Sequence, residues 1–317
     1  MIKIGETRRN ASVLAAAFAC CASLANAGCS RDAIEAVNLA NEGDKAFEMN
    51  VEDAISKYDR ASKLDPDNNR ILFKLAKAYK KKEDWPKVAA TCAKAEAADE
   101  KNHKKKTFAS YYFLHGYAIE QQATKGGAAW GDAKQPFETA VQIDPNLSQA
   151  YEELGEVQLH SDDEQGAIQK YTKAIETKPD ELQFYPPLAD LYMRLNFNKE
   201  AEQVLREGLS YAKEGDKHLF AVHALLGNVL EMKNDLTGSI SEYEAAKKAC
   251  GACDDHKEAY FLLGSAYAAA SPPRKNEAIQ QLQSFWKITC KGALAKRYED
   301  QCSQSQEIVK RLGGALQ

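Results

Sequence analysis

Residues 165–179 read "QGAIQKYTKAIETKP", and residues 52–66 read "EDAISKYDRASKLDP". Both stretches follow one order of residue types: an alanine, a tyrosine four residues later, a second alanine three residues after that, and a proline five residues further on. Residues 132–145, "DAKQPFETAVQIDP", repeat this order with a phenylalanine in place of the tyrosine. Because residues three and four apart share one face of a helix, each stretch predicts an amphipathic helix that ends before its proline.

A second helical pattern precedes each of these stretches and carries one small residue at a fixed place. "YEELGEVQLH" (151–160) and "YFLLGSAYAA" (260–269) show it. Two helices that cross closely need a small residue at the crossing, and a large residue of the other helix fills the groove beside it. The small residues are Gly43, Ala76, Gly116, Gly155, Ala189, Gly227 and Gly264. The large ones in the following helices are Tyr58, Cys92, Phe137, Tyr171, Leu205, Tyr243 and Leu282.

This arrangement resembles the tetratricopeptide repeat, a helix-turn-helix unit of about 34 residues. The resemblance implies an all-α fold, a right-handed superhelix of about seven units in which each helix pair stacks on the next. We expect the repeat array to cover residues 29–290. Residues 293–312 continue with a helical pattern that two glycines end, which predicts a capping helix within residues 291–317.

The first 28 residues have the layout of a signal peptide. A charged start is followed by the uncharged stretch "ASVLAAAFACCASLANA" (11–27), which ends in an A-x-A cleavage site. Alternatively, Ala27, Gly28 and Cys29 match part of a bacterial lipobox, although Asn26 departs from the aliphatic residue expected there. Cys29 is therefore a candidate for lipidation. Either cleavage predicts export to the periplasm, with an outer-membrane anchor if Cys29 is lipidated.

Composition narrows the function classes. The net charge of -4 does not suggest a general nucleic-acid binder, which is usually basic. No segment after the predicted signal peptide is apolar for long enough to span a membrane. The sequence contains no phosphate-cradling glycine loop, no nucleophile elbow and no catalytic constellation, so we expect neither catalytic activity nor a cofactor or metal.

Proteins of the resembled family usually bind partners on a concave face that the first helices line. Positions counted from each small residue change from basic, through aromatic, to acidic along the chain, and such a surface suits a peptide or partner helix of mixed charge. Ordinary solvated helix faces are the alternative. The candidate residues are Phe73, Lys77, Lys80, Lys81, Phe113, Tyr117, Glu120, Glu152, Glu156, Asp190 and Arg194.

The cysteines predict disulfides, because these persist outside the cytoplasm. Cys250, Cys253, Cys290 and Cys302 allow three pairings. Cys250–Cys253 with Cys290–Cys302 is one, and Cys253–Cys290 linking adjacent repeats is another. We favour the first because its loops are short. Two aspartates follow Cys253, and a predicted helix end precedes Cys250; both disfavour the thiolate that redox catalysis requires. Zinc would need a second pair of suitable spacing, and the separation between Cys290 and Cys302 is not the usual one.

These observations predict a non-enzymatic scaffold that holds other proteins together in the bacterial cell envelope. An N-terminal anchor followed by repeats is similar in layout to lipoproteins of gliding motility and pilus assembly. One alternative is a periplasmic module that binds a peptide or partner on behalf of an envelope enzyme. A more remote alternative is a thiol-disulfide oxidoreductase that uses Cys250 and Cys253.

Overall fold

The computed structural model describes residues 31–101 and 108–316, except for the side chains of Glu100 and Lys101. The predicted signal peptide, its cleavage site and Cys29 lie outside these residues. The described chain is all helical, as predicted, and contains no strand. None of the helices in these two ranges is both long and apolar enough to cross a membrane.

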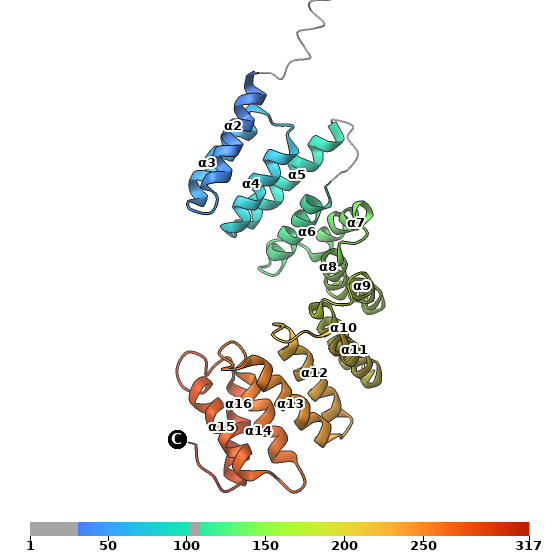
Figure 1. Cartoon of the computed structure of the whole chain (residues 1–317), viewed down its shortest axis with the longest axis vertical. Helices are drawn as coiled ribbons and strands as arrows, with labels where there is room; N and C mark the ends of the chain where they lie inside the picture. The colour runs from blue at the N-terminus through green and yellow to red at the C-terminus, as the bar shows by residue number, and fades with distance from the viewer. Residues whose placement is uncertain (1–30, 102–107, 317) are drawn as a thin grey trace, which may run out of the picture. The chain divides into compact units, whose positions relative to one another are not determined.

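The chain forms two compact units, one ending at Ile143 and the other beginning at Asp144 (Figure 1). The helices of the first unit are α2 (Arg31–Ala46), α3 (Val51–Leu64), α4 (Asn69–Lys81), α5 (Trp85–Lys101), α6 (Ala109–Ala123), a short 3-10 helix η1 (Trp130–Ala133) and α7 (Lys134–Ile143). The second unit contains α8 (Ser148–Leu159), α9 (Glu164–Thr177), the 3-10 helix η2 (Leu182–Phe184), α10 (Tyr185–Arg194), α11 (Asn198–Tyr211), α12 (Leu219–Met232), α13 (Leu236–Cys250), α14 (Glu258–Ala269), α15 (Lys275–Thr289) and α16 (Glu299–Arg311).

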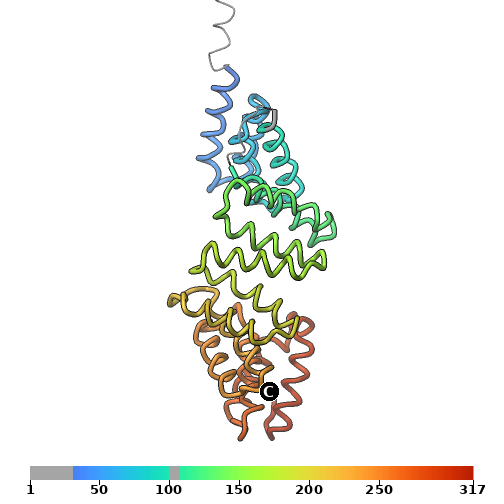
Figure 2. The backbone as a smooth tube through the Cα atoms, turned by 90° about the vertical axis from the view of Figure 1, so that its right-hand side faces the viewer, coloured from blue at the N-terminus to red at the C-terminus, as the bar shows by residue number. Residues whose placement is uncertain are grey.

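Consecutive helices pack as pairs within each unit. Three pairs, α2/α3, α4/α5 and α6/α7, form the first unit. Four pairs from α8/α9 to α14/α15 form the second unit, and α16 packs on the last of them. Figure 2 shows the chain running back and forth through each unit. The described residues therefore contain the seven helix pairs that the sequence predicts.

The predicted contact between a small and a large residue holds these pairs together. A Cβ atom added to Gly43 would lie 2.5 Å from the ring of Tyr58, and one added to Gly155 would lie 2.5 Å from the ring of Tyr171. Gly116 meets Phe137 in the same way, at 2.8 Å. Real Cβ atoms do not approach another heavy atom this closely, so alanine does not fit at these crossings without displacing the ring. The large rings are buried.

The last helix begins later than the sequence predicts. Residues 293–298 form successive turns, and α16 starts at Glu299. These turns bring Tyr298 edge-on to Phe285, with ring centres 5.7 Å apart. Phe285 occupies the place where earlier repeats have alanine or glycine, so the capping segment packs against a large residue instead of a small one. The helix ends as predicted, with Gly313 in the left-handed region at φ 82°.

Exposed ion pairs link successive helix pairs in one direction. The acid belongs to the earlier pair and the base lies 30 to 33 residues later in five examples. These are Asp44 with Lys74, Glu48 with Lys81, Glu52 with Lys82, Glu202 with Lys233 and Glu244 with Arg274. An exposed pair contributes only about 0.2–1 kcal/mol, so the set fixes the register of neighbouring pairs more than it stabilises the fold.

Candidate partner-binding face

The residue that follows the small residue of the first helix serves the core in some of the repeats. In three repeats it accepts a hydrogen bond from the tyrosine of the second helix: Asp44 from Tyr58 at 2.8 Å, Glu156 from Tyr171 at 2.6 Å, and Asn228 from Tyr243 at 2.6 Å. Each of these polar side chains therefore satisfies a tyrosine hydroxyl of the core. A side chain that is used in this way contributes less to partner binding.

The second and third repeats lack that tyrosine. Cys92 and Phe137 replace it, and neither has a hydroxyl to satisfy. The residues at the matching place of the first helices are Lys77 on α4 and Tyr117 on α6. Neither Cys92 nor Phe137 therefore offers these side chains the tyrosine hydroxyl that the matching residues bind in the other three repeats.

Aromatic rings pack in two groups across these two repeats. Tyr117 stacks on Phe113 with ring centres 6.3 Å apart and meets Trp85 edge-on at 5.6 Å. Phe113 also contacts Phe137, at 5.7 Å. Phe73 lies edge-on to another ring on α6, that of Tyr111, at 6.3 Å. The predicted aromatic residues of α4 and α6 are therefore all packed against other rings.

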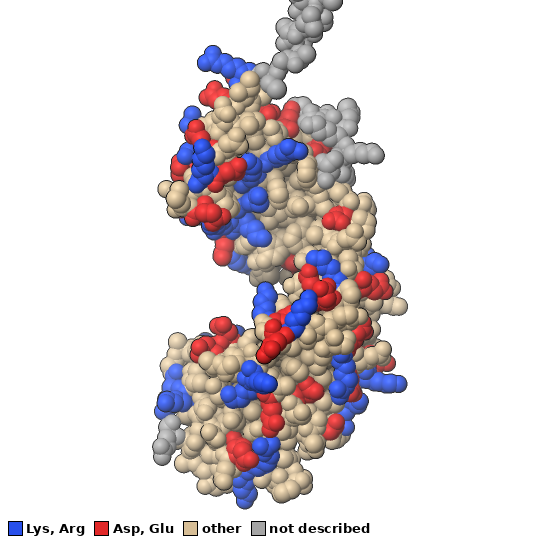
Figure 3. Space-filling model, viewed as in Figure 1, with Lys and Arg blue, Asp and Glu red and all other residues tan. Residues whose placement is uncertain are grey.

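Two exposed lysines lie over these rings. The Nζ atom of Lys77 is 5.2 Å from the centre of the Phe73 ring, and that of Lys80 is 5.2 Å from the centre of the Tyr117 ring. No ion pair joins either lysine to a carboxylate of the described chain. Figure 3 shows blue side chains gathered over α4. We call Phe73, Lys77, Lys80, Phe113 and Tyr117 the lysine–aromatic face.

The sequence predicts that Lys81 binds a partner, as it does for Lys77 and Lys80. In the structure, however, Lys81 already contacts the preceding helix pair. Its Nζ atom lies 2.7 Å from the Glu48 carboxylate, donates to the Phe47 carbonyl at 3.1 Å and lies 4.8 Å from the centre of the Phe47 ring. Lys81 therefore links α4 to the preceding helix pair. Lys74, which the sequence did not single out, pairs with Asp44 at 2.5 Å. Both ion pairs have a signal in the sequence, because each lysine follows an acidic residue by 30 to 33 positions.

Glu120 corrects one prediction. Its side chain is only 4% exposed, so it lies in the core of the α6/α7 pair and does not present a carboxylate to a partner. Counting one turn on from Gly116 places it on the predicted face. However, the turn between the two helices is longer in this repeat, residues 124–133, than in the fourth, residues 160–163, and the η1 helix in this insertion packs on α6. The tertiary packing of the repeat overrides the simple helical count.

The acidic positions of the second unit have another environment. Burial, together with the negative charges of Glu153, Glu156 and Glu181, raises the pKa of the part-buried Glu152 to about 8. This carboxyl is therefore mostly protonated at neutral pH. Asp190 and Arg194 are exposed on α10, and no ion pair joins them. The predicted residues of the two units thus form separate groups, and the acidic group carries less charge than its composition suggests.

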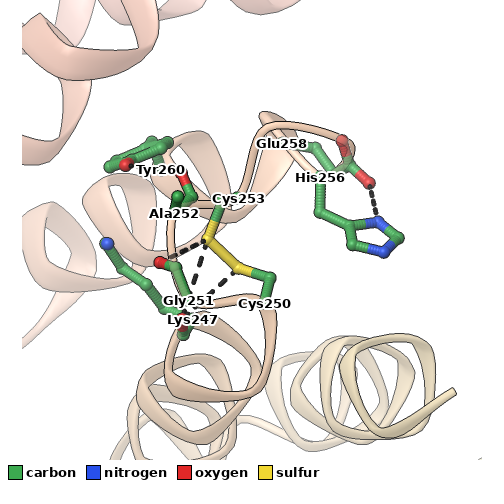
Figure 4. Close-up of a disulfide and its surroundings, with 8 residues drawn as sticks. All are labelled: Lys247, Cys250, Gly251, Ala252, Cys253, His256, Glu258 and Tyr260. Carbon is green, nitrogen blue, oxygen red and sulfur yellow. Dashed lines mark hydrogen bonds and ion pairs between the residues drawn. A yellow bond between two sulfur atoms is a disulfide. The ribbon is translucent and has the colours of Figure 1, made fainter. Parts of the chain in front are cut away.

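The four cysteines form the two local disulfides. Cys250 bonds to Cys253 across the turn after α13, and Cys290 at the end of α15 bonds to Cys302 on α16. Neither bond joins two helix pairs. In Figure 4 the first disulfide lies against backbone carbonyls, with the Sγ of Cys250 3.3 Å from the Lys247 oxygen. Cys92 is a buried free thiol.

The surroundings of Cys250 and Cys253 do not stabilise a thiolate. Carbonyl oxygens face both sulfur atoms, and the end of a helix carries partial negative charge. The His256 ring points toward Glu258 (Figure 4). It also stacks on Phe220, with ring centres 3.9 Å apart. The Lys247 ammonium lies over the Tyr260 ring, at 4.2 Å from its centre. The geometry therefore favours a structural disulfide that closes the turn, and not a redox-active cysteine pair.

Comparisons with known proteins agree with this fold. A family model for the TPR repeat matches residues 50–83. No curated protein sequence matches the chain. Among solved structures, the C-terminal part of a TPR repeat-containing protein from Cytophaga hutchinsonii is 13% identical, with a TM-score of 0.61 over 81% of this chain and 98% of that one.

Two further structures share the fold at similarly low identity. PilF from Pseudomonas aeruginosa is 17% identical, with a TM-score of 0.53 over 68% of this chain and 92% of that one. MamA from Desulfovibrio magneticus RS-1, from residue 41 to its end, is 15% identical, with a TM-score of 0.51 over 60% of this chain and 100% of that one. The chain therefore contains a match to the TPR repeat at residues 50–83, and it shares the fold of a solved TPR repeat-containing protein along most of its length.

Proposed function

We propose that this protein is a non-enzymatic scaffold of the bacterial cell envelope that binds a partner protein through its lysine–aromatic face. The observation that carries the proposal is the pair of exposed lysines held over aromatic rings without a carboxylate partner in the described chain. Aromatic rings contribute much of the binding energy of many protein interfaces, and exposed charges set which partner they attract. A partner segment with acidic and apolar side chains complements this face.

The envelope part of the proposal rests on the sequence. The signal-peptide layout of residues 1–28 supports export, and Cys29 is the candidate lipid attachment site. The similarity in layout to gliding-motility and pilus-assembly lipoproteins suggests a role in assembling a multiprotein machine. Mass spectrometry of the mature N-terminus tests this part: a diacylated Cys29 supports an anchor, Gly28 as the first residue supports a free periplasmic protein, and an uncleaved Met1 contradicts export.

Charge reversal on the face tests partner binding. We expect Lys77→Glu with Lys80→Glu to abolish cross-linking of the native partner to a photoreactive residue placed at position 113 of the tagged protein in cells. The matched control is Lys134→Glu with Lys199→Glu, which makes the same change in net charge at exposed sites in the first turns of α7 and α11. Equal cross-linking by both variants, with circular dichroism showing both folded, contradicts the assignment of the face.

A further inference from the structure

The first unit contains a groove on a different side of α4. It lies between α3 and α5, has a volume of about 640 Å³, and has Leu72, Leu75 and Tyr79 of α4 among its lining residues. The two leucines are buried, at 3% and 4% exposure. None of the residues of the lysine–aromatic face lines this space. We call it the α3–α5 groove.

Small side chains of α5 account for the space. Counted from the small residue that opens each second helix, four positions of α5 that line the groove carry Ala90, Thr91, Ala97 and Ala98. The same positions of α9 carry Gln169, Lys170, Glu176 and Thr177. Those of α11 carry Gln203, Val204, Ser210 and Tyr211. The longer side chains of α9 and α11 occupy volume that α5 leaves open beside α3.

Two hydroxyl groups line the groove. One belongs to Thr91 of α5, a residue that is 6% exposed. Tyr79 presents a second hydroxyl to the same space. Burial and the nearby negative charge of Asp59 raise its pKa, so this hydroxyl stays protonated at neutral pH and can donate.

One cation of the groove is available for a ligand. Lys63 is paired with Asp59, with Nζ and Oδ2 2.6 Å apart, and Lys87 is paired with Asp84 at 2.7 Å. Lys94 also lines the groove, and no ion pair joins it to the rest of the described chain. Because Lys94 is three residues after Thr91, the two side chains lie on one face of α5. An acidic group bound there meets a positive charge and a hydroxyl together.

We propose that the α3–α5 groove binds a small single-chain amphiphile with an acidic head group. Its aliphatic chain lies over Leu72 and Leu75, and its head accepts from Lys94 and Thr91. The volume is in the range of about 300–1,000 Å³ that is typical of small-molecule sites.

Calorimetric titration of the purified mature-length chain with laurate, below its micelle concentration, tests the proposal. We expect saturable binding with a stoichiometry of one. Ala90→Leu with Ala97→Leu fills the groove from exposed positions and should weaken binding at least about tenfold. The matched control, Ala93→Leu with Ala249→Leu, adds the same volume at exposed positions outside the groove and should leave affinity unchanged. Thermal melts show whether each variant is folded.

A second titration tests the head group. Lys94→Gln should weaken laurate binding about fivefold and leave the binding of dodecanol unchanged, because only the carboxylate needs the charge. Absence of laurate binding, equal affinity in the filled and control variants, or a Lys94→Gln protein that binds laurate normally would each overturn the proposal. So would binding to phosphatidylglycerol vesicles without binding of free laurate. Cross-linking at the lysine–aromatic face is independent of these results.

Discussion

The first helices of the second and fourth repeats use the same positions in opposite ways. Phe73 and Glu152 stand at one place in the repeat, and Lys77 and Glu156 stand at another. In α8 the tyrosine of the second helix donates to Glu156, and burial leaves Glu152 with a raised pKa. In α4 the second helix supplies Cys92 instead, and Lys77 lies over the Phe73 ring. The identity of one buried residue thus decides whether its neighbour serves the core or remains available to a partner.

Truncation of the buried residue at this position, Tyr171 or Cys92, should show the largest difference between the two repeats. We expect Tyr171→Ala to lower the free energy of unfolding by about 3–5 kcal/mol, since it removes a large buried ring and leaves Glu156 without its donor. Cys92→Ala at the same repeat position removes one sulfur atom and should cost about 1–2 kcal/mol. Urea denaturation followed by circular dichroism measures both. Similar losses would show that the two positions are equivalent after all.

The disulfides, both in the second unit, give the next contrast. Cys290→Ser with Cys302→Ser should destabilise that unit by about 3 kcal/mol, because the bond closes a 12-residue separation in the unfolded chain. The Cys250–Cys253 bond closes only a three-residue separation, so Cys250→Ser with Cys253→Ser should cost about 2 kcal/mol. Calorimetry with and without a reductant measures the effect. If the reductant also lowers the unfolding temperature of the first unit, the stabilising effect of the disulfides is not confined to the second unit.

The pH dependence of stability tests the buried acid. The pKa of Glu152 is raised in the folded chain, so its contribution to stability is complete below about pH 4.5 and is lost as the pH rises through about 8. Glu152→Gln keeps the neutral form at every pH. Because Glu152 is only part-buried, we expect the variant to gain about 2 kcal/mol on the natural protein between pH 5 and pH 9. If the free energy of unfolding depends on pH in the same way for both proteins, the Glu152 carboxyl is exposed to solvent and its pKa is not raised.

The smallest effect distinguishes two lysines of α4. Lys81→Gln should lower the free energy of unfolding by about 0.5–1 kcal/mol, because it removes the contact with Glu48 and the Phe47 carbonyl. Lys77→Gln removes the contact with the Phe73 ring and a weak attraction to Asp44, and it should cost less than about 0.5 kcal/mol. Partner cross-linking should show the reverse order. If Lys77 proves the more important for stability, its role in the lysine–aromatic face must be reconsidered.

The repeated pattern made the pairing of helices predictable. The positions of Gly43 and Gly155 predict the crossings with Tyr58 and Tyr171, because sterics allow a large ring only beside a small residue. The exchange of tyrosine for Cys92 was also visible in the sequence. Its consequence for Lys77 was not, because that consequence depends on a hydrogen bond between two helices.

Other features depend on contacts that a helical count does not contain. Glu120 falls on the predicted face by its spacing, but it is buried in a repeat that carries an insertion. Lys80 and Lys81 are consecutive, and only their distances from acids of the preceding pair separate them. The start of α16 moved to Glu299, where a disulfide and the Tyr298–Phe285 contact hold the preceding turns. In each case long-range packing overrides the local pattern.

The one-directional ion pairs also bear on how the chain assembles. The substantial helix contacts in the described chain join helices that are adjacent or one apart in the sequence, and each acid has its base 30 to 33 residues later. A chain that emerges N-terminus first can therefore complete one helix pair as soon as the next has emerged. Until then, the first helix pair presents an unpaired row of acids, Asp44, Glu48 and Glu52, at its growing edge. Such a row repels the same row on another unfinished chain, which disfavours association between nascent chains.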